Sequence, residues 1–353
     1  MKITMIGKSG SGKTSFMSGL HDVLMLKSID GFCIKPSAED FKTSIRTLGK
    51  FSKISIQNRG FIFPDGTQHT TLWNFDFLHN HNKVCEFGWI DYRGGILDDI
   101  YSGSITGNEE NEIDELIGHI ALSNAVIIFA DSILLSLYDN TEERRYHTGA
   151  NIIFNILGNY FSHCNNRNLN IILLLTKTDS DLISDDFIAE DYKKLIAIGV
   201  ETFGETINLC NNNSKNWKCA VLPIGVIGRE NLKTIVENPD SFRQSYTICA
   251  DITGIPKPFN LEYVIFYCIC ETLEQIKKYQ SGEINNLKDE AEHYLSKSNF
   301  LKEFWALITN QNSPKKIAQS LFDKLEEEKK SVRLIEKPIS DLKTITYKKV
   351  KEI

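Results

Sequence analysis

The chain has 353 residues, of which 41% are hydrophobic, and its 40 Lys and Arg against 46 Asp and Glu give a formal net charge of −6. This length suffices for one large domain with a smaller extension, or for two domains. The negative charge argues against a general nucleic-acid binder, because phosphate backbones need a basic surface. The sequence has no run of about 18 apolar residues, so we expect no membrane-spanning helix. Eight cysteines without metal-type spacing, and no secretory signal before the first strand, predict a cytoplasmic protein with reduced thiols.

The chain opens with an apolar strand, residues 2–6, and a glycine-rich loop, GKSGSGKT, at residues 7–14. The loop obeys the G-x-x-x-x-G-K-[ST] pattern, and an amphipathic helical pattern follows over residues 13–27. Glycines let the backbone turn tightly, so that successive N–H groups point inward and form an anion nest at the positive end of the helix. The loop therefore predicts a phosphate site formed by Gly7, Ser9, Gly10, Ser11, Gly12, Lys13, Thr14 and Ser15.

Two side chains of this loop have specific expected roles. Lys13 should reach the β- and γ-phosphates of a nucleotide and act on them during catalysis, and the Thr14 hydroxyl should ligate Mg²⁺. A long spacer, residues 30–66, comes next in the chain. Within it, SAEDFKTSIRTLGKF begins with Ser37 as a helix N-cap and continues with apolar residues at helical spacing, which predicts a small inserted helix.

Residues 71–78 and 84–91 predict the two strands of an antiparallel hairpin, because both are strand-like segments that flank a polar turn and the side chains of the first alternate between two faces. The second strand ends in DYRG, residues 91–94, which is a D-x-x-G pattern. An acidic residue at the carboxyl end of a strand suits a water-mediated Mg²⁺ contact. We therefore expect Asp91 to hold the metal and the Gly94 N–H to sense a γ-phosphate.

The middle of the chain alternates between helical patterns and apolar runs. Residues 96–111 are rich in glycine, serine and acidic residues and predict a mobile switch segment. Helical patterns are present at residues 112–123, 142–163 and 186–210. The continuous apolar runs suit central parallel strands with both faces covered, and they span residues 125–131 and 170–177.

The second of these strands ends in TKTD, residues 176–179. The Asp179 carboxylate can accept hydrogen bonds from N1–H and N2–H₂ of guanine, whereas adenine lacks this donor pair and would leave the carboxylate unpaired. The stem of Lys177 can lie over the base and ribose, and Thr176 belongs to the same nucleotide-binding motif. The alternative is an ordinary turn from strand to helix, capped by Thr and Asp side chains.

A sixth strand is predicted at residues 218–224, an irregular segment at 229–258 and a last core helix at about 260–280. We therefore expect residues 1–280 to form an α/β domain, doubly wound, with a mostly parallel six-stranded sheet that includes one antiparallel hairpin strand. Ligands bind such sheets at the carboxyl ends of the strands, where all three motifs fall.

Residues 281–353 form a Lys- and Glu-rich extension with a helical pattern from about 284 to 330. From Lys324 onward it has nine basic and six acidic residues, a net charge of +3. That excess is too small to predict a nucleic-acid surface, and it indicates a solvated helix or an extension that docks a partner.

In GKSGSGKT, DYRG and TKTD, in this order, the sequence resembles the GTPase superclass of P-loop proteins, in its translation-factor and Ras-like branch. The resemblance covers about residues 1–270 and implies GTP or GDP as the nucleotide and Mg²⁺ as the metal. It also implies a base contact in VLPIGVIG, residues 221–228, although the usual Ser-Ala-Lys is missing. The candidates for this contact are Ile224, Gly225 and Val226.

The resemblance further implies a threonine that ligates Mg²⁺ in the first switch, just before the hairpin. Thr67 stands at the expected separation, and Thr70 and Thr71 are the alternatives. The Ras-like glutamine that orients the attacking water is replaced by Gly95, so slow intrinsic hydrolysis is expected.

Another group could compensate for Gly95. Arg93 could neutralise charge on the γ-phosphate, or it could face solvent or a partner. His69, His79 and His81 are near the motif in the sequence, and loop histidines are more often solvated than catalytic.

More narrowly, the chain resembles bacterial double-GTPase-type proteins of predicted conflict and phage-defence operons. This resemblance rests on the long spacer from Leu26 to Phe63 and on FPDGT, WIDYRGG and GIPKPFNLEYVIFYCI. It implies antiviral defence and a protein partner or effector, such as a second GTPase or a second copy of the chain.

Three functions remain open at this point. The first is a Mg²⁺-dependent GTPase switch, in which GTP orders residues 64–71 and 92–110 and hydrolysis releases them. The second, favoured by Gly95, is a nucleotide-bound scaffold with little turnover. The third is an ATP-dependent kinase or ATPase, which would make Asp179 incidental.

Overall fold

The computed structural model describes residues 1–25, 27–37, 71–92, 95–102, 107–163, 168–237, 247–252, 256–297 and 314–352. It contains two compact units: Met1–Cys268 together with Thr346–Ile353, and Ile269–Ile345. The helix α10 (Leu261–Lys297) crosses the division between the two units, and its first residues belong to the first unit.

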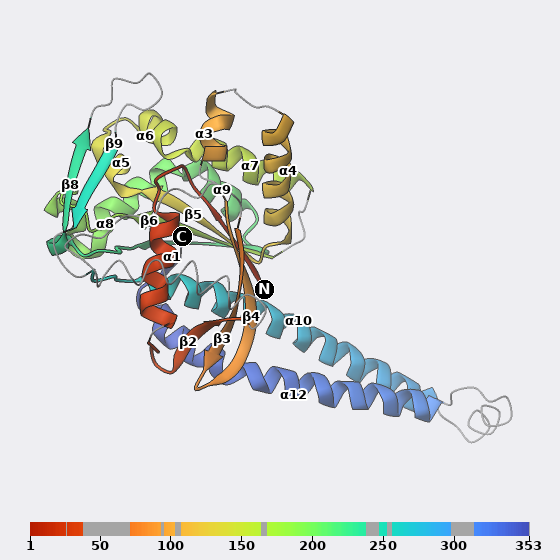
Figure 1. Ribbon diagram of the computed structural model, residues 1–353. Coiled ribbons are helices and arrows are strands. Elements are labelled where there is room, and N and C mark those ends of the chain that lie inside the picture. Colours follow the sequence, from red (N-terminus) through yellow and green to blue (C-terminus); the bar gives the residue numbers. More distant parts are fainter. Residues whose placement is uncertain are drawn as a thin grey trace. The chain divides into compact units, whose positions relative to one another are not determined.

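An eight-stranded sheet forms the centre of the first unit, with the order β10-β7-β6-β5-β1-β4-β3-β2 (Figure 1). The strands are β1 (Lys2–Ile6), β2 (Phe32–Pro36), β3 (Thr71–His79), β4 (Asn82–Asp91), β5 (Ala125–Asp131), β6 (Leu169–Thr176), β7 (Trp217–Pro223) and β10 (Lys351–Glu352). The pairs β1–β4, β1–β5, β5–β6 and β6–β7 are parallel. The pairs β2–β3, β3–β4 and β7–β10 are antiparallel. Five strands, β1 and β4 to β7, therefore end at the same edge of the sheet.

All six predicted strands are present, which confirms the mostly parallel α/β sheet and its hairpin. The predicted count of six strands and the single antiparallel strand were wrong, because β2 and β10 extend the sheet at its two edges. β2 has five residues and includes a proline, and β10 has two. Neither has the apolar run that marks a buried central strand, so the sequence signal was weak.

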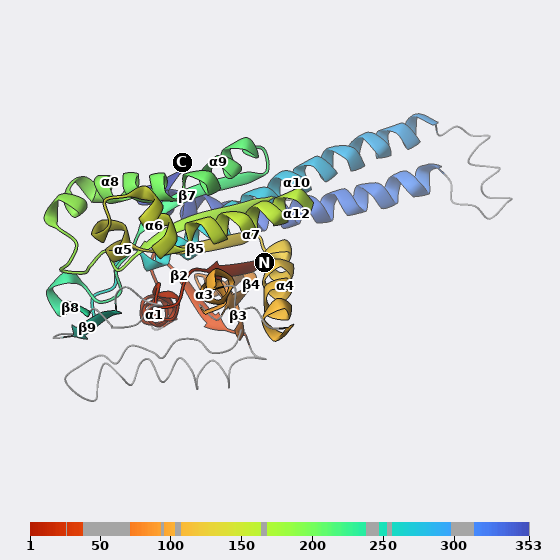
Figure 2. The same cartoon turned by 90° about the horizontal axis from the view of Figure 1, so that it is seen from above.

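Helices cover both faces of the sheet, as a doubly wound fold requires (Figures 1 and 2). One face packs against α3 (Gly95–Ser102), α4 (Gly107–Leu122), α7 (Ala150–His163), α8 (Asp185–Thr202) and α9 (Gly204–Asn212). On the other face, Phe16 of α1 (Lys13–Leu20) stacks on Trp89 of β4, with ring centroids 5.6 Å apart. Phe266 of α10 contacts Phe32 and Phe77 on that face.

Several predicted helices have different limits. The pattern at 142–163 is divided into α6 (Thr141–Thr148) and α7 by Gly149, whose φ of 77° ends α6 in the left-handed conformation that glycine favours. The pattern at 186–210 is divided at Phe203 into α8 and α9. The helix predicted after Ser37 lies outside the described residues.

Residues 229–258 were predicted to be mostly irregular, and this was wrong. There, β8 (Leu232–Glu237) and β9 (Thr247–Ile252) form a separate two-stranded antiparallel sheet. Both strands are short and carry charged residues, so the nearby prolines dominated the sequence pattern. Most of residues 96–111, the predicted switch segment, belong to α3 and α4.

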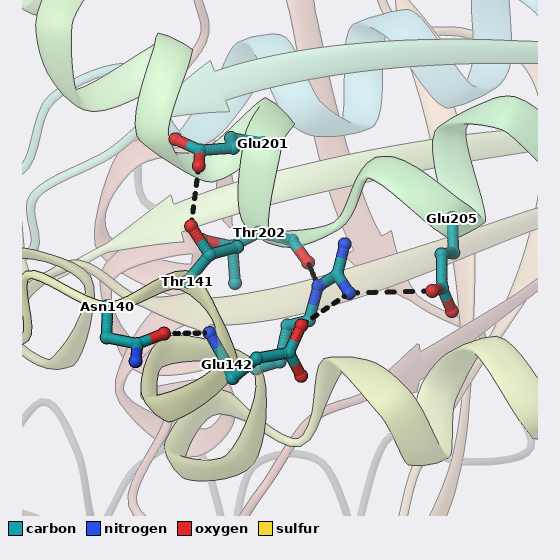
Figure 3. A network of polar contacts seen from close by, with 7 residues as sticks. Asn140, Thr141, Glu142, Glu201, Thr202 and Glu205 are labelled. Carbon is teal, nitrogen blue, oxygen red and sulfur yellow. Dashed lines mark hydrogen bonds and ion pairs between the residues drawn. The ribbon is translucent and has the colours of Figure 1, made fainter.

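Polar contacts fix α6 to the neighbouring helices, as Figure 3 shows. Thr141 donates a hydrogen bond to Glu201 of α8, and Arg145 pairs with Glu205 of α9 at 3.5 Å. Asn140 caps α6 by accepting a hydrogen bond from the Glu142 N–H at 2.8 Å. These contacts fix α6 to α8 and α9.

The second unit comprises parts of α10 and α12 (Pro314–Thr346). Ion pairs join Lys277 to Glu336 and Lys343 to Glu274, each at 3.0 Å. Because rising numbers on one helix meet falling numbers on the other, the helices are antiparallel. Among the described residues, no helix has the length and apolar character needed to cross a membrane.

Candidate functional site

The three sequence motifs meet at one edge of the sheet. The 7–14 loop follows β1, Asp91 ends β4, and Thr176 ends β6. Register places Met5 of β1 beside Asp91, and Asp131 of β5 beside Thr176. Since β5 lies between β1 and β6, the carboxyl ends that carry the motifs are neighbours.

The phosphate loop has the backbone shape that its glycines predict. Gly10 and Gly12 have φ of 74° and 96°, a region that residues with a Cβ rarely adopt. Gly7 is needed for a different reason, since a Cβ there would lie 2.9 Å from the Phe129 carbonyl oxygen. The Phe16 N–H donates to the Gly12 carbonyl at 2.8 Å, which continues the loop directly into α1.

Lys13 is buried with its charged end turned toward the loop. Only 6% of the residue is exposed. Its Nζ donates hydrogen bonds to the carbonyl oxygens of Gly7 at 2.7 Å and Lys8 at 3.0 Å. The loop therefore holds a buried ammonium among backbone groups, at the start of a helix.

The Thr176 hydroxyl connects the phosphate loop to the two central strands. Its Oγ1 lies 2.7 Å from the Ser11 carbonyl oxygen and 3.2 Å from that of Ala130, and it donates toward both. Thr176 is 2% exposed, so these contacts are shielded from water. The first residue of TKTD thus fixes the loop to the ends of β5 and β6.

Lys177 has φ of 57°, and its Nζ pairs with Asp131 Oδ2 at 2.5 Å. The other oxygen, Asp131 Oδ1, accepts from the Ile133 N–H at 3.0 Å and caps α5 (Ser132–Leu137), a helix that the sequence did not predict. The aliphatic stem of Lys177 therefore extends from the end of β6 toward the end of β5.

Asp179 is buried at 4% exposure, and the loop after β7 fixes one of its two oxygens. Oδ2 accepts hydrogen bonds from the N–H groups of Ile227 at 2.7 Å and Gly228 at 2.8 Å. For Oδ1, the described part of the chain provides no hydrogen-bond donor. A ligand that covers this carboxylate would therefore need to supply donors to Oδ1, because an acceptor buried without a donor costs about 1–3 kcal/mol.

The predicted base-edge residues lie next to this carboxylate. The Ile224 N–H donates to the Leu175 carbonyl at 2.8 Å, so it belongs to the backbone of the sheet edge. The Gly225 N–H points at the Phe259 carbonyl at 3.5 Å, a long contact. For the Val226 N–H, no acceptor is found within the described ranges.

Other predicted residues are not placed. Thr67, Thr70, Arg93 and Gly94 lie outside the described residues, and Gly95 is the first residue of α3. Thr71 begins β3 directly opposite Asp91. In the described ranges, no three His, Cys, Asp or Glu residues are grouped as a metal site would need.

The histidines of the hairpin do not belong to the site. His79 pairs with Asn82 at the end of the β3–β4 ladder that lies away from Asp91, and His81 is in the turn between these strands. The His79 ring stacks on Phe32 with centroids 4.2 Å apart. His79 and His81 therefore do not lie beside Gly95 or Asp91, because the hairpin turns at the opposite edge of the sheet.

Sequence reasoning missed three residues around Asp179: Tyr192 of α8, Arg229 and Phe259. Burial raises the pKa of the Tyr192 phenol, and a hydrogen bond with Thr178 opposes that rise. No motif marks these residues, since they come from three different segments of the chain. Only the segment GIPKPFN, in which Phe259 follows a proline, gave a local sequence signal.

No family model matches the sequence, and no match was found among curated proteins. Among solved structures, the chain is similar to the signal recognition particle receptor SRb-GTP/SRX complex from Chaetomium thermophilum, with 12% identity and a TM-score of 0.35. The matched region covers 64% of this chain and 90% of that chain. Likeness at this level identifies neither a family nor a function.

Proposed function

We propose that the chain binds a guanine nucleotide together with Mg²⁺ and hydrolyses GTP to GDP, as a switch for a protein partner. The observation that carries this proposal is the link made by the Thr176 hydroxyl. Thr176 is bonded to the phosphate loop at Ser11, and three residues later Asp179 presents a buried carboxylate. A guanine nucleotide needs a phosphate-binding loop at one end and a carboxylate that faces the base at the other.

The choice of guanine follows from the donors that Asp179 requires. Its Oδ2 is held by two backbone N–H groups, which orients the carboxylate. Guanine offers N1–H and N2–H₂ side by side, whereas adenine offers no such pair at the matching edge. Leaving a buried acceptor without a donor costs about 1–3 kcal/mol, and more for a charged group. ATP should therefore bind more weakly than GTP by at least about tenfold.

The phosphates would be held by the loop of residues 7–14 and by Lys13. The Lys13 ammonium now donates to two neutral carbonyl oxygens. Hydrogen bonds to charged phosphate oxygens are stronger, so the ammonium can exchange these carbonyl partners for phosphate oxygens. Thr14 and Asp91, with Thr67 as a third group, are the residues proposed to hold Mg²⁺, which would neutralise charge on the β- and γ-phosphates. Asp91 suits this role because it is buried beside the strand that leads into the loop.

Turnover by the chain alone should be slow. Gly95 begins α3 without a side chain that could orient the attacking water. Arg93, or a residue of the partner, would have to supply the missing stabilisation of the γ-phosphate. A nucleotide-bound scaffold with little hydrolysis is therefore the second candidate function. The sequence resemblance alone supports a second GTPase or a second copy as partner, and a role in bacterial phage defence.

Binding and hydrolysis assays of the full chain with GTP and ATP, each with and without Mg²⁺, test the proposal. We expect GTP to bind in preference to ATP and hydrolysis to be slow and to require Mg²⁺. Equal competition by ATP would remove the guanine assignment. Tight GTP binding with no measurable turnover would favour the scaffold.

A further inference from the structure

Two aromatic side chains lie beside the Asp179 carboxylate. The rings of Tyr192 and Phe259 stack with centroids 6.1 Å apart and planes 16° apart. A Cβ built on Gly225 would lie 2.1 Å from Cε1 of Phe259 and 2.8 Å from Cγ of Asp179, so the ring edge and the carboxyl group border the same point. Both aromatic residues are partly exposed, and they can therefore contact a ligand that reaches Asp179.

Tyr192 is held there by an unusual backbone. Residues 190–192 have φ of 51°, 56° and 63°, which interrupts α8 with three consecutive left-handed residues that are not glycine. This conformation is unfavourable for residues with a Cβ, and it persists only where the surroundings fix it. Such strain is concentrated at functional sites, and here it occurs at the residue whose ring stacks on Phe259.

The loop after β7 fixes both Asp179 and the segment that leads to Tyr192. Gly228 donates its N–H to Asp179, and the next residue, Arg229, donates from Nη2 to the Ile183 carbonyl at 2.9 Å. Arg229 also pairs with Asp185 at 3.1 Å. Phe259 is attached to the same loop, because its N–H donates to the Gly225 carbonyl at 2.9 Å.

We propose that Tyr192 and Phe259 form an aromatic wall of the base site, against which the base of a nucleotide held by Asp179 packs. The inference rests on the proposed function, since it requires Asp179 to face a base. Aromatic contact adds affinity for any base, because every base has a π-face, whereas the carboxylate selects by its hydrogen bonds. The wall therefore raises the affinity for purine nucleotides without choosing among them, and Asp179 makes the choice.

Calorimetric titration of the full chain with GDP, IDP and inorganic pyrophosphate separates these two contributions. IDP lacks the 2-amino group of guanine, and pyrophosphate lacks a base. For Phe259→Leu we expect the GDP and IDP affinities to fall by a common factor, on the order of 10 to 100, and the pyrophosphate affinity to stay unchanged. Tyr192→Leu should act in the same direction, and Tyr192→Phe, which keeps the ring, should stay within about threefold of the parent.

Tyr279→Leu is the matched control, because Tyr279 is 71% exposed on α10 in the second unit. It should leave all three affinities unchanged. Unchanged GDP affinity in Phe259→Leu would overturn the aromatic wall and leave the proposed function intact. An equal loss of GDP and pyrophosphate affinity would also overturn it, since the residue would then act on the fold. If the parent chain binds pyrophosphate but neither GDP nor IDP, the proposed function itself fails.

Discussion

The two ends of the candidate nucleotide site are built in different ways. The phosphate end, residues 7–14, is one continuous loop between β1 and α1. The base end consists of Asp179, Tyr192, the loop 224–229 and Phe259, which come from four separate segments. A continuous loop depends on its own glycines and on the following helix, whereas the base end depends on long-range contacts. Substitutions should therefore affect the two ends independently.

The Thr176 hydroxyl is the exception to this independence. It belongs to the segment that carries Asp179, and it bonds to the Ser11 carbonyl of the phosphate end. The following predictions test how far the two ends can be separated, from the largest expected effect to the smallest.

Lys13→Ala should remove binding at the phosphate end and with it the whole nucleotide. We expect the affinities for GDP and pyrophosphate both to fall by at least about 100-fold, because hydrogen bonds to charged phosphate oxygens are among the strongest in proteins. Calorimetry measures both ligands. Lys8→Ala in the same loop is the control, since the Lys8 ammonium lies 5.8 Å from the centre of the Tyr146 ring. Unchanged affinity in Lys13→Ala would remove the phosphate assignment.

Asp179→Asn should damage the base end alone. We expect GDP to bind roughly 100-fold more weakly, because the NH₂ group of the new asparagine would face the N1–H and N2–H₂ donors of guanine. Xanthine nucleotides carry a carbonyl acceptor in place of the 2-amino group of guanine, so their affinity should rise relative to that of guanine nucleotides. Competition between GDP and XDP measures the change, and pyrophosphate affinity should be preserved. An identical preference for GDP in the variant and the parent would show that Asp179 does not contact the base.

Gly225→Ala should displace Phe259, because the new Cβ would lie 2.1 Å from its ring. We expect a loss of GDP affinity of about tenfold. The same substitution in a Phe259→Leu background should cost less, since residues in contact give non-additive effects. A double-mutant cycle on GDP affinity measures the coupling. Additive losses would mean that the close approach of Gly225 and Phe259 does not matter for binding.

Thr176→Val tests the link between the two ends with almost no change in shape. The variant loses the donor to the Ser11 and Ala130 carbonyls, so the free energy of unfolding should fall by about 1–2 kcal/mol. Urea unfolding at constant m-value measures this loss. Thr178→Val is a matched comparison, because the Thr178 hydroxyl donates to the Ile224 carbonyl instead. If only Thr176→Val lowers pyrophosphate affinity, the hydrogen bond from Thr176 to Ser11 helps to hold the phosphate loop in its binding conformation.

Much of the fold could be predicted because central strands and a phosphate loop have strong local patterns. β5 and β6 are buried along their whole length, so their sequences are uninterrupted apolar runs. The strands at the sheet edges, β2 and β10, have no such run. Residues 142–163 keep a helical pattern across Gly149, and only the positive φ of that glycine shows where α6 ends.

The candidate site could be predicted only where the chain is contiguous. The motifs at residues 7–14 and 176–179 were recognisable because phosphate and guanine chemistry require particular residue types at fixed spacing. Arg229 and Tyr192 carry no such signature. Their neighbours depend on the course of the loop after β7 and on an irregular turn in α8, neither of which follows from a periodic pattern.

By itself, the sequence determined where the central strands and the phosphate loop lie in the chain, and that Asp179 is the candidate carboxylate. These features depend on residues that are close together in the chain. Tertiary structure alone decided which oxygen of Asp179 is already bonded and which aromatic rings stand beside it. The hydrogen bonds that the loop after β7 makes around this site join residues 46 or more positions apart, such as Ile183 with Arg229 and Asp179 with Ile227. Local propensities carry no information about such pairs, and only the packing of the sheet and its helices brings them together.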